Sequence, residues 1–404
     1  MQHAQFPMMS ERRTSMIAAL LIALGPLSMS FYTPAMPELA LAFDTPEAAI
    51  KLTLSVYFGG FAVAQLFAGP IADAYGRRMA TLVFMTIYMI GSLMAAFATS
   101  VEFLIVGRLV QGIGAAVGQT VARAIVRDQF AGQQAARIMN MAGIILAIAP
   151  ALSPALGGVM LVSLGWRSIF FAMLAISIVA LTIVLTFMSE TTVPDRNRAH
   201  PIPLLKAYSA IIMNPIFLTS TIVIASAIGA LYTLATILPF ILIDEVGLTP
   251  AQFGLGMLGQ SGMFLLGSLT YRMLMRRFSS ETLIWPGLGF IAAGSLAALI
   301  TGLFLTPSYL SIMGPVGLYA FGIAFVMPHL MVAALQPFPN TAGSASSMMG
   351  FLQMGTGLLG GFIAAFFTDP HFAMIIIMPS MGTICVLTYV LYSWLTKRAA
   401  LMAM

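Results

Sequence analysis

The chain has 404 residues, of which 60% are hydrophobic and only 8% are charged. A soluble globular protein carries about 25% charged residues, so this composition excludes an ordinary water-soluble domain and predicts that lipid covers much of the surface. The net charge of +5 comes from basic residues in short, separated segments, which argues against nucleic-acid binding. The single cysteine, Cys385, excludes an internal disulfide, and we expect neither a metal nor a cofactor.

Apolar runs long enough to cross a bilayer recur along the chain. A membrane-spanning helix needs about 20 mostly apolar residues. The first run is too long for the core of a signal peptide and many equal runs follow it, so we expect a retained helix. The predicted fold class is an all-α polytopic membrane protein with twelve transmembrane helices, which cover residues 14–36, 50–72, 79–99, 102–124, 138–162, 167–188, 213–241, 250–274, 283–304, 309–334, 344–367 and 372–396.

A polar, proline-rich stretch interrupts this pattern between Glu190 and Lys206. Such a composition is typical of a linker, and it divides the predicted helices into six plus six. We therefore predict an N-terminal six-helix bundle in residues 1–189, a cytoplasmic linker in residues 190–207 and a C-terminal six-helix bundle in residues 208–404. A six-plus-six chain suits a transporter with its substrate site between the halves.

The basic residues indicate how the chain lies in the membrane. With the amino terminus inside, fifteen Lys and Arg residues fall in inner segments and only Lys51 and Arg167 in outer ones. Segments rich in Lys and Arg stay on the cytoplasmic side of a membrane. We therefore expect a multi-pass protein of the bacterial inner membrane with both termini and the linker in the cytoplasm.

Two ionisable residues are candidates for proton or charge coupling, because such groups within a bilayer are rare and usually functional. Arg108 lies in the fourth predicted helix, about 9 Å inward from Glu102 at 1.5 Å per residue. Glu38 ends the first helix at a similar depth. In the functional interpretation, Glu38 loads and releases a proton beside the fixed charge of Arg108. The alternatives are a structural arginine and a solvated loop glutamate.

Uncharged polar residues within the predicted spans are candidates for a substrate cavity, because an amide that faces lipid lacks hydrogen-bond partners. For each of them a hydrogen bond between helices is an equal alternative. The candidates are Ser30, Tyr32, Gln65, Gln111, Gln119, Asn140, Tyr232, Gln260 and Gln353.

The fifth predicted helix concentrates small residues and prolines in one stretch, which permits close helix approach and bending. A bend point in a moving helix is the functional interpretation, and a static packing face is the alternative. The residues concerned are Pro150, Ser153, Pro154, Gly157 and Gly158.

The stretch from Gly69 to Arg78 sets a Gly-Pro pair, one acid, a turn glycine and two arginines between two apolar runs. It predicts a tight cytoplasmic turn between membrane helices. Asp73 is expected to face the start of the eleventh helix, at Asn340, Thr341 and Ser344, where a carboxylate gains about 0.3–1 kcal/mol. The hypothesis is a gate that favours the outward-open state, made by Gly69, Asp73, Gly76, Arg77, Arg78, Arg127 and Asp128. A basic anchor that fixes topology is the alternative.

These stretches resemble motifs of the major facilitator superfamily, and within it the drug/proton antiporters of the twelve-helix class. Gly69 to Arg78 matches the loop motif GxxxDxxGRR, RLVQGIGAA at 108–116 resembles the fourth-helix motif, and SPALGG at 153–158 resembles the antiporter motif. Four further stretches resemble the bicyclomycin and chloramphenicol resistance group: ARAIVRD at 122–128, GWRSIFF at 165–171, Glu190-Thr191 and AGSASSMMGFLQ at 342–353.

The resemblance covers nearly the whole chain and implies two helix bundles, alternating access and export of small amphipathic drugs or metabolites against protons. One departure is Ser30, which stands where that group commonly has an aspartate, and a serine carries no proton at physiological pH. We expect a monomeric secondary transporter and not an enzyme. The alternatives are a facilitator or symporter for a specific sugar or amino acid, and a sensor that transports nothing.

Overall fold

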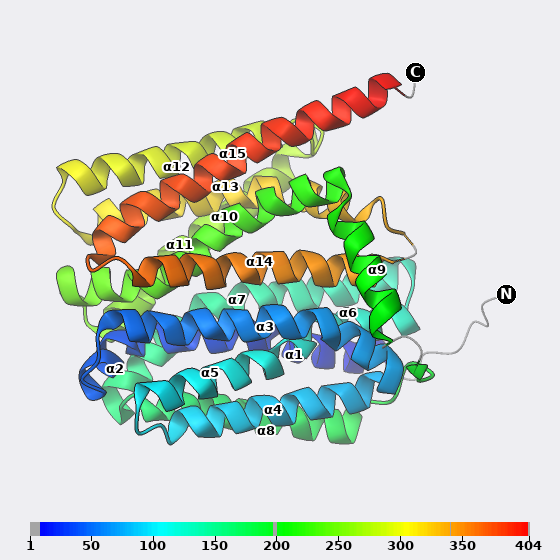
Figure 1. The fold of residues 1–404 in the computed structure, drawn as a ribbon, viewed down its shortest axis with the longest axis horizontal. Helices are drawn as coiled ribbons and strands as arrows, with labels where there is room; N and C mark the ends of the chain where they lie inside the picture. The colour runs from blue at the N-terminus through cyan, green and yellow to red at the C-terminus, as the bar shows by residue number, and fades with distance from the viewer. Residues whose placement is uncertain (1–8, 197–199, 340, 403–404) are drawn as a thin grey trace.

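The computed structural model describes residues 9–196, 200–339 and 341–402, with the backbone alone at 136, 140, 142–147, 201 and 399–402. Long helices lie side by side along one direction, and both ends of the chain emerge at the same end of the bundle (Figure 1). We call this end, where α1 begins and α15 ends, the termini face, and the opposite end the far face. The predicted all-α polytopic fold is confirmed.

The helices follow the predicted spans closely. In the first half they are α1 (Glu11–Tyr32), η1 (Thr33–Ala35), α2 (Met36–Ala42), α3 (Glu47–Tyr75), α4 (Arg77–Ala96), α5 (Val101–Ala115), α6 (Val117–Gln129), α7 (Gly132–Leu164) and α8 (Arg167–Phe187). After them come α9 (Pro201–Ile212), α10 (Pro215–Pro239), η3 (Phe240–Glu245), α11 (Pro250–Leu274), α12 (Ile284–Phe304), α13 (Tyr309–Leu335), α14 (Ala342–Ala365) and α15 (Pro370–Met402).

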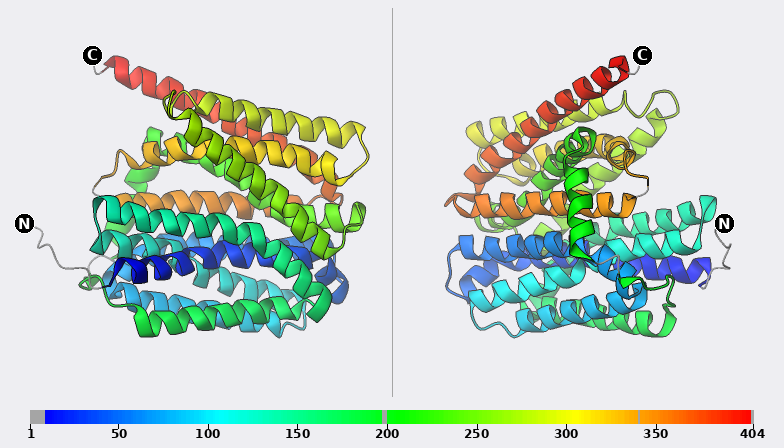
Figure 2. Two further views of the ribbon diagram at one scale, coloured as in Figure 1. Left: turned by 180° about the vertical axis from the view of Figure 1, so that it is seen from behind. Right: turned by 45° about the vertical axis from the view of Figure 1, so that its right-hand side comes forward.

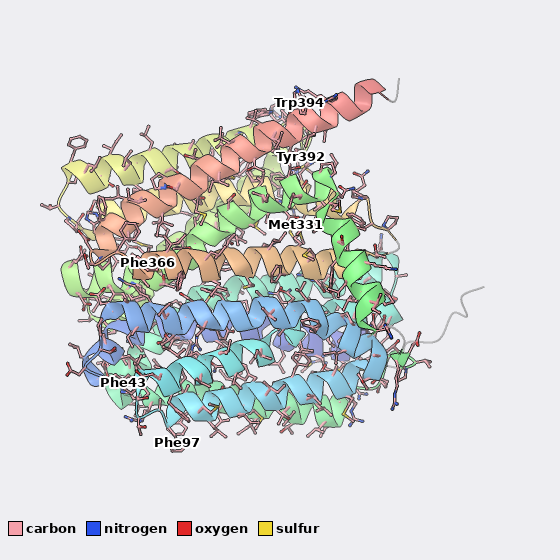
Figure 3. All side chains as sticks on the ribbon, viewed as in Figure 1. Phe43, Phe97, Met331, Phe366, Tyr392 and Trp394 are labelled. Atoms are coloured by element: carbon pink, nitrogen blue, oxygen red, sulfur yellow. The ribbon has the colours of Figure 1, made fainter. Side chains whose placement is uncertain are left out.

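Ten helical stretches of the described residues are long and apolar enough to cross a membrane. α7 runs beside them, and α11 crosses the bundle obliquely (Figure 2). Two apolar cores hold the helices together, one built mainly from residues 9–188 and the other from residues 208–392. Large apolar side chains also point outward from the helices (Figure 3), such as Phe97 and Phe366, which are 64% and 74% exposed. These outward faces suit lipid, which has no hydrogen-bonding groups to offer.

Prolines inside the helices free backbone carbonyls, and side-chain hydroxyls occupy three of them. A proline has no N–H, so the carbonyl four residues before it loses its helical partner. Pro34, Pro70 and Pro315 stand four residues after Ser30, Leu66 and Ser311. The freed carbonyls accept from Thr33 at 2.9 Å, from Tyr208 at 2.6 Å and from Thr301 at 2.8 Å. The hydroxyls therefore satisfy backbone carbonyls that the prolines leave without a helical partner.

The predicted linker contains the start of α9, which lies across the ends of the other helices at the termini face (Figures 1 and 2). α9 packs against α14 and α10 of the second half. Its Tyr208 hydroxyl donates to the Leu66 carbonyl of α3, in the first half. The linker helix thus contacts both halves, α3 through this hydrogen bond and the second half through packing.

Candidate functional site

Arg108 lies at the centre of the first half and is fully buried. Its Cζ lies 4.4 Å from the ring centroids of both Tyr32 and Tyr57, so the guanidinium is held between two aromatic faces. It donates to the Gln111 side-chain oxygen, and Gln111 in turn donates to the Ser92 hydroxyl at 2.8 Å. Within the described part of the chain, the Arg108 Nε and Nη2 atoms have no hydrogen-bond partner. Arg108 therefore keeps donors that are free to meet a ligand or a carboxyl group.

Glu38 lies on α2 near the far face, half-buried and beside the backbone of Trp166. Among the described residues, no carboxylate forms an ion pair with Arg108, Glu38 included. The structure thus places both predicted coupling residues in the first half without bringing them into contact.

The turn between α3 and α4 is held in place by hydrogen bonds to a side chain that follows α8, at the end of the first half. Gly76 has φ +97°, a conformation that residues with a Cβ rarely adopt. The Glu190 carboxylate accepts from the backbone N–H groups of Arg77 at 2.7 Å and Arg78 at 3.1 Å. A Cβ at position 76 would collide with this carboxylate. Glycine is therefore required here twice, for the backbone angle and for room for the acid that caps α4.

The predicted gate acids pair with arginines of the same half. Arg77 is only 2% exposed; it forms an ion pair with Asp73 and bonds Asp128 at 3.1 Å through Nε. Arg78 donates to the Leu185 carbonyl at 2.7 Å. Arg127 is largely exposed and approaches Asp128 at 3.9 Å. These residues form one network at the termini face, within the first half.

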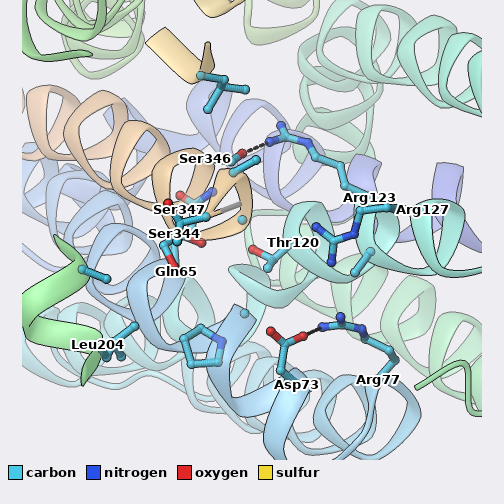
Figure 4. Close-up of a pocket in the computed structure, with 18 of the residues that line it drawn as sticks. Gln65, Asp73, Arg77, Thr120, Arg123, Arg127, Leu204, Ser344, Ser346 and Ser347 are labelled. Atoms are coloured by element: carbon cyan, nitrogen blue, oxygen red, sulfur yellow. Dashed lines mark hydrogen bonds and ion pairs between the residues drawn. The ribbon is translucent and has the colours of Figure 1, made fainter. Parts of the chain in front are cut away.

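A cavity of about 710 Å³ opens at the termini face between the halves (Figure 4). Asp73 and Gly69 line it from α3, and Thr341 and Ser344 line it from the start of α14. The partner of Asp73 is Arg77, and Asn340 lies outside the described residues. The bond that crosses the cavity runs instead from Arg123 Nη1 to the Ser346 hydroxyl, at 2.7 Å.

The far face is closed by direct backbone contact between the halves. Gly158 of α7 packs against the backbone of Pro250, and Gly254 of α11 packs against that of Pro154. Gly157 packs against the backbone of Phe31 on α1. Of the remaining predicted bend residues, Ser153 donates to the Ala149 carbonyl within α7, and Pro150 is half-buried.

The other candidates for a substrate cavity are scattered. Gln65 lines the cavity at the termini face, and the Tyr232 ring lies 5.2 Å from that of Phe58, across the halves. Ser30 is buried, and three glutamines are half-buried: Gln119, Gln260 and Gln353. The side chain of Asn140 lies outside the described residues.

Sequence reasoning missed Lys51, which it assigned to an outer segment. Lys51 is 1% exposed, forms an ion pair with Glu47 at 3.0 Å and lies 5.0 Å from the Phe240 ring centroid of the other half. The spacing of Glu47 and Lys51, four residues apart on one helix, was a signal for this pair. The sequence offered no comparable signal for the cross-half contact with Phe240.

Comparisons with known proteins agree with this architecture. The family model described as Major Facilitator Superfamily matches residues 18–365. The chain is 28% identical over 369 residues to multidrug resistance protein MdtL of Citrobacter koseri, covering 91% of this chain and 92% of the relative. It is 29% identical over 348 residues to the protein of the same name from Klebsiella pneumoniae, covering 85% and 86%.

Solved structures with the same fold include a D-xylose-proton symporter, with a TM-score of 0.70, 14% identity and coverage of 94% of this chain and 97% of that one. The human organic anion transporter MFSD10 has a TM-score of 0.65 and 18% identity, and the match covers 95% and 99%. At such low identity the likeness extends to the fold alone.

Proposed function

Because this chain belongs to the Major Facilitator Superfamily, whose members are membrane transporters and not enzymes, we propose that it exports small amphipathic drugs or metabolites by alternating access in exchange for protons. The coarser statement, a multi-pass secondary transporter of a small molecule, follows from the family itself. The name of the curated relatives, multidrug resistance protein, supports the proposed substrate class. We propose that the chain acts as a monomer, with an N-terminal six-helix bundle in residues 1–189, a cytoplasmic linker in residues 190–207 and a C-terminal six-helix bundle in residues 208–404.

The observation that carries the proposal is the asymmetry of the two ends. A cavity separates the halves at the termini face, while glycine-to-backbone contacts close the far face. In alternating access, a central site opens to one side of the membrane at a time. The cycle therefore needs this state and a second state that is closed at the termini face and open at the far face. With the basic termini face in the cytoplasm of a bacterial cell, this state would load an exported molecule from inside.

In the proposed cycle, the halves approach each other at the termini face while the far face opens. Asp73 then meets the start of α14, whose dipole favours a carboxylate. The network of Asp73, Arg77 and Asp128 would hold this acid in position. The gate would thus stabilise the outward-open state, and it would have to separate again for the cavity to reopen.

The proposed route for protons must differ from that of relatives with an acid in the first helix, because this chain has Ser30 there. Glu38 is the candidate proton carrier on this segment, and Arg108, with two donors unused, is the fixed charge that responds to it. Since the two are not in contact in this state, their coupling would require movement between α2 and α5.

A drug-susceptibility panel tests the proposal. Cells that express the protein, compared with cells that carry an Arg108→Ala variant, should tolerate several amphipathic drugs better, and a protonophore should remove the difference. Export that persists after the proton gradient collapses would exclude proton exchange. Unchanged susceptibility to every compound would instead favour a transporter for one metabolite, or a protein that transports nothing.

A further inference from the structure

The cavity at the termini face has a surplus of positive charge. Three arginines and one acid line it, Arg77, Arg123, Arg127 and Asp73. The charge of Arg77 is compensated by Asp73 and Asp128. Among the described residues, Arg123 bonds only a serine hydroxyl, and Arg127 is 61% exposed and lies 3.9 Å from an aspartate that Arg77 already binds. Two guanidinium groups, both from α6, are therefore available to an anion.

The start of α14 adds to this field. Residues 341–344 line the cavity, and the N-cap residue Thr341 makes no side-chain capping hydrogen bond. The first N–H groups of a helix lack partners within it and carry partial positive charge, which favours anions. The hydroxyls of Ser344, Ser346 and Ser347 lie along the same wall, opposite the arginines (Figure 4).

Gln65 supplies an independent observation. Its side chain is 3% exposed and lines the same cavity, yet its Oε1 atom has no hydrogen-bond partner in the portion of the chain that the structure describes. A buried acceptor without a partner is unfavourable, because it has lost its hydrogen bonds to water and gained none in the protein. A hydrogen-bond donor on a bound molecule would relieve this, so Gln65 points to a ligand with an N–H or O–H group.

We propose that this cavity binds amphipathic molecules that carry a carboxylate or similar anionic group together with a hydrogen-bond donor. The anion meets Arg123 and Arg127 beside the start of α14, the donor meets Gln65, and the apolar part lies against Leu204 and Leu335. A volume of about 710 Å³ matches sites for small organic molecules. This inference rests on the proposed export function, since it names the class of molecule that the exporter loads.

Three matched probes test the assignment on the purified full-length protein. Dansylglycine has a carboxylate and a sulfonamide N–H; its methyl ester lacks the charge, and dansylsarcosine lacks the N–H. Fluorescence titration should show that dansylglycine binds at least tenfold more tightly than the ester and several-fold more tightly than dansylsarcosine. Its affinity should also fall as salt screens the arginines. Equal affinity for the acid and the ester would overturn the proposal.

Variants then locate the probe. Arg123→Gln should weaken dansylglycine binding about tenfold, the scale of one lost charge-assisted hydrogen bond, and leave the ester within twofold. Gln65→Met should remove the preference over dansylsarcosine. Arg277→Gln is the matched control, because Arg277 is an exposed arginine that does not line the cavity. A loss in the control equal to that in Arg123→Gln would place the anion elsewhere and contradict the site.

The two proposals fail separately. If the neutral ester is exported from cells but dansylglycine does not bind, the export function stands and the anion site is wrong. If dansylglycine binds with the predicted dependence on Arg123 and Gln65 but no compound is exported, the anion site stands and the proposed export function is wrong.

Discussion

Three charged side chains of the described residues are almost fully buried, and each is stabilised differently. Lys51 has a carboxylate on the preceding turn, and Arg77 has two aspartates. Arg108 has two aromatic faces and one amide oxygen instead. A buried charge without a counter-ion is unfavourable unless the environment compensates it, and cation–π contacts give about 0.5–2 kcal/mol each. Arg108 is therefore the buried charge in the described part of the chain that is best placed to respond to a new anion.

Arg108→Ala should abolish transport while the protein remains inserted. The change removes the guanidinium from between the two tyrosine rings and leaves Gln111 without its donor. Transport into proteoliposomes is the measurement, with the protein amount checked in the same vesicles. Arg167→Ala is the control and should retain activity, because Arg167 is an exposed arginine whose Cζ lies 4.1 Å from the ring centroid of Trp166. Full activity in Arg108→Ala would assign Arg108 a structural role at most.

Glu38→Gln should weaken the dependence of transport on an imposed pH gradient, because glutamine keeps the shape of the side chain and cannot bind or release a proton. The measurement is transport into proteoliposomes at several gradients. Glu102→Gln, at an exposed position on α5, serves as the control and should leave the pH dependence unchanged. If Glu38→Gln behaves like the control, Glu38 has no part in coupling.

At the residue scale, the sequence could identify unusual side chains but not their partners. Arg108 stood out because a charge within an apolar run is rare. Its neighbours Tyr32 and Tyr57 come from other helices, and helix periodicity alone does not define which faces meet. Lys51 was assigned to an outer segment and Glu190 to the linker, because hydropathy does not distinguish a solvated charge from one buried against another segment.

At the scale of elements, hydropathy located the spans but not the breaks within them. The bilayer fixes the length of a spanning helix, so apolar runs marked the helices well. Three features were not predicted: the break at Ala116 between α5 and α6, the π-helical turn η3 and the helix α9. They lie inside or beside apolar stretches whose hydropathy does not mark a break or an extra helix. Proline positions held more information, since each one marks a carbonyl that needs another donor.

Tyr208 and Pro70 should be energetically coupled. In the wild type, Tyr208→Phe leaves the Leu66 carbonyl unpaired and should destabilise the protein by about 1–3 kcal/mol. In a Pro70→Ala background, the introduced alanine supplies the missing N–H within α3, so the same change should destabilise the protein by less than half as much. Denaturant unfolding of the four purified proteins measures the double-mutant cycle. Additive effects would show that Tyr208 does not act through the Leu66 carbonyl.

For the whole molecule, the six-plus-six arrangement was predictable because the polar linker is the one long interruption of the apolar pattern. The relation between the halves was not, because it depends on a conformational equilibrium and not on a single packing. Gly158 and Gly254 touch the opposite half in this state, and the cavity separates Asp73 from its predicted partner. In the proposed cycle, Asp73 and the start of α14 would meet only in the opposite state.

Asp73→Asn should shift the equilibrium between states toward the cavity-open one, because it removes the charge that the start of α14 would stabilise. A gain of about 0.3–1 kcal/mol corresponds to a population shift of about two- to fivefold. The measurement is the labelling rate of a cysteine at position 344, in a Cys385→Ala background, by an impermeant maleimide in inside-out vesicles.

Labelling should be about two- to fivefold faster with Asp73→Asn. Glu281→Gln removes an exposed acid from the same end of the molecule and should leave the rate unchanged. If the rate and the transport activity are also unchanged in Asp73→Asn, the gate does not depend on this carboxylate.

The hydrogen bonds between Glu190 and the start of α4 also affect the order in which the first half is completed during synthesis. Arg77 and its cap are 113 residues apart, so at 5–20 residues per second the first turn of α4 waits roughly ten seconds for the acid that completes it. All eight helices from α1 to α8 precede Glu190 in the chain, and the helices of the second half follow it. The arrival of Glu190 therefore coincides with completion of the first bundle, which can be held together at the membrane surface before the second bundle has been inserted.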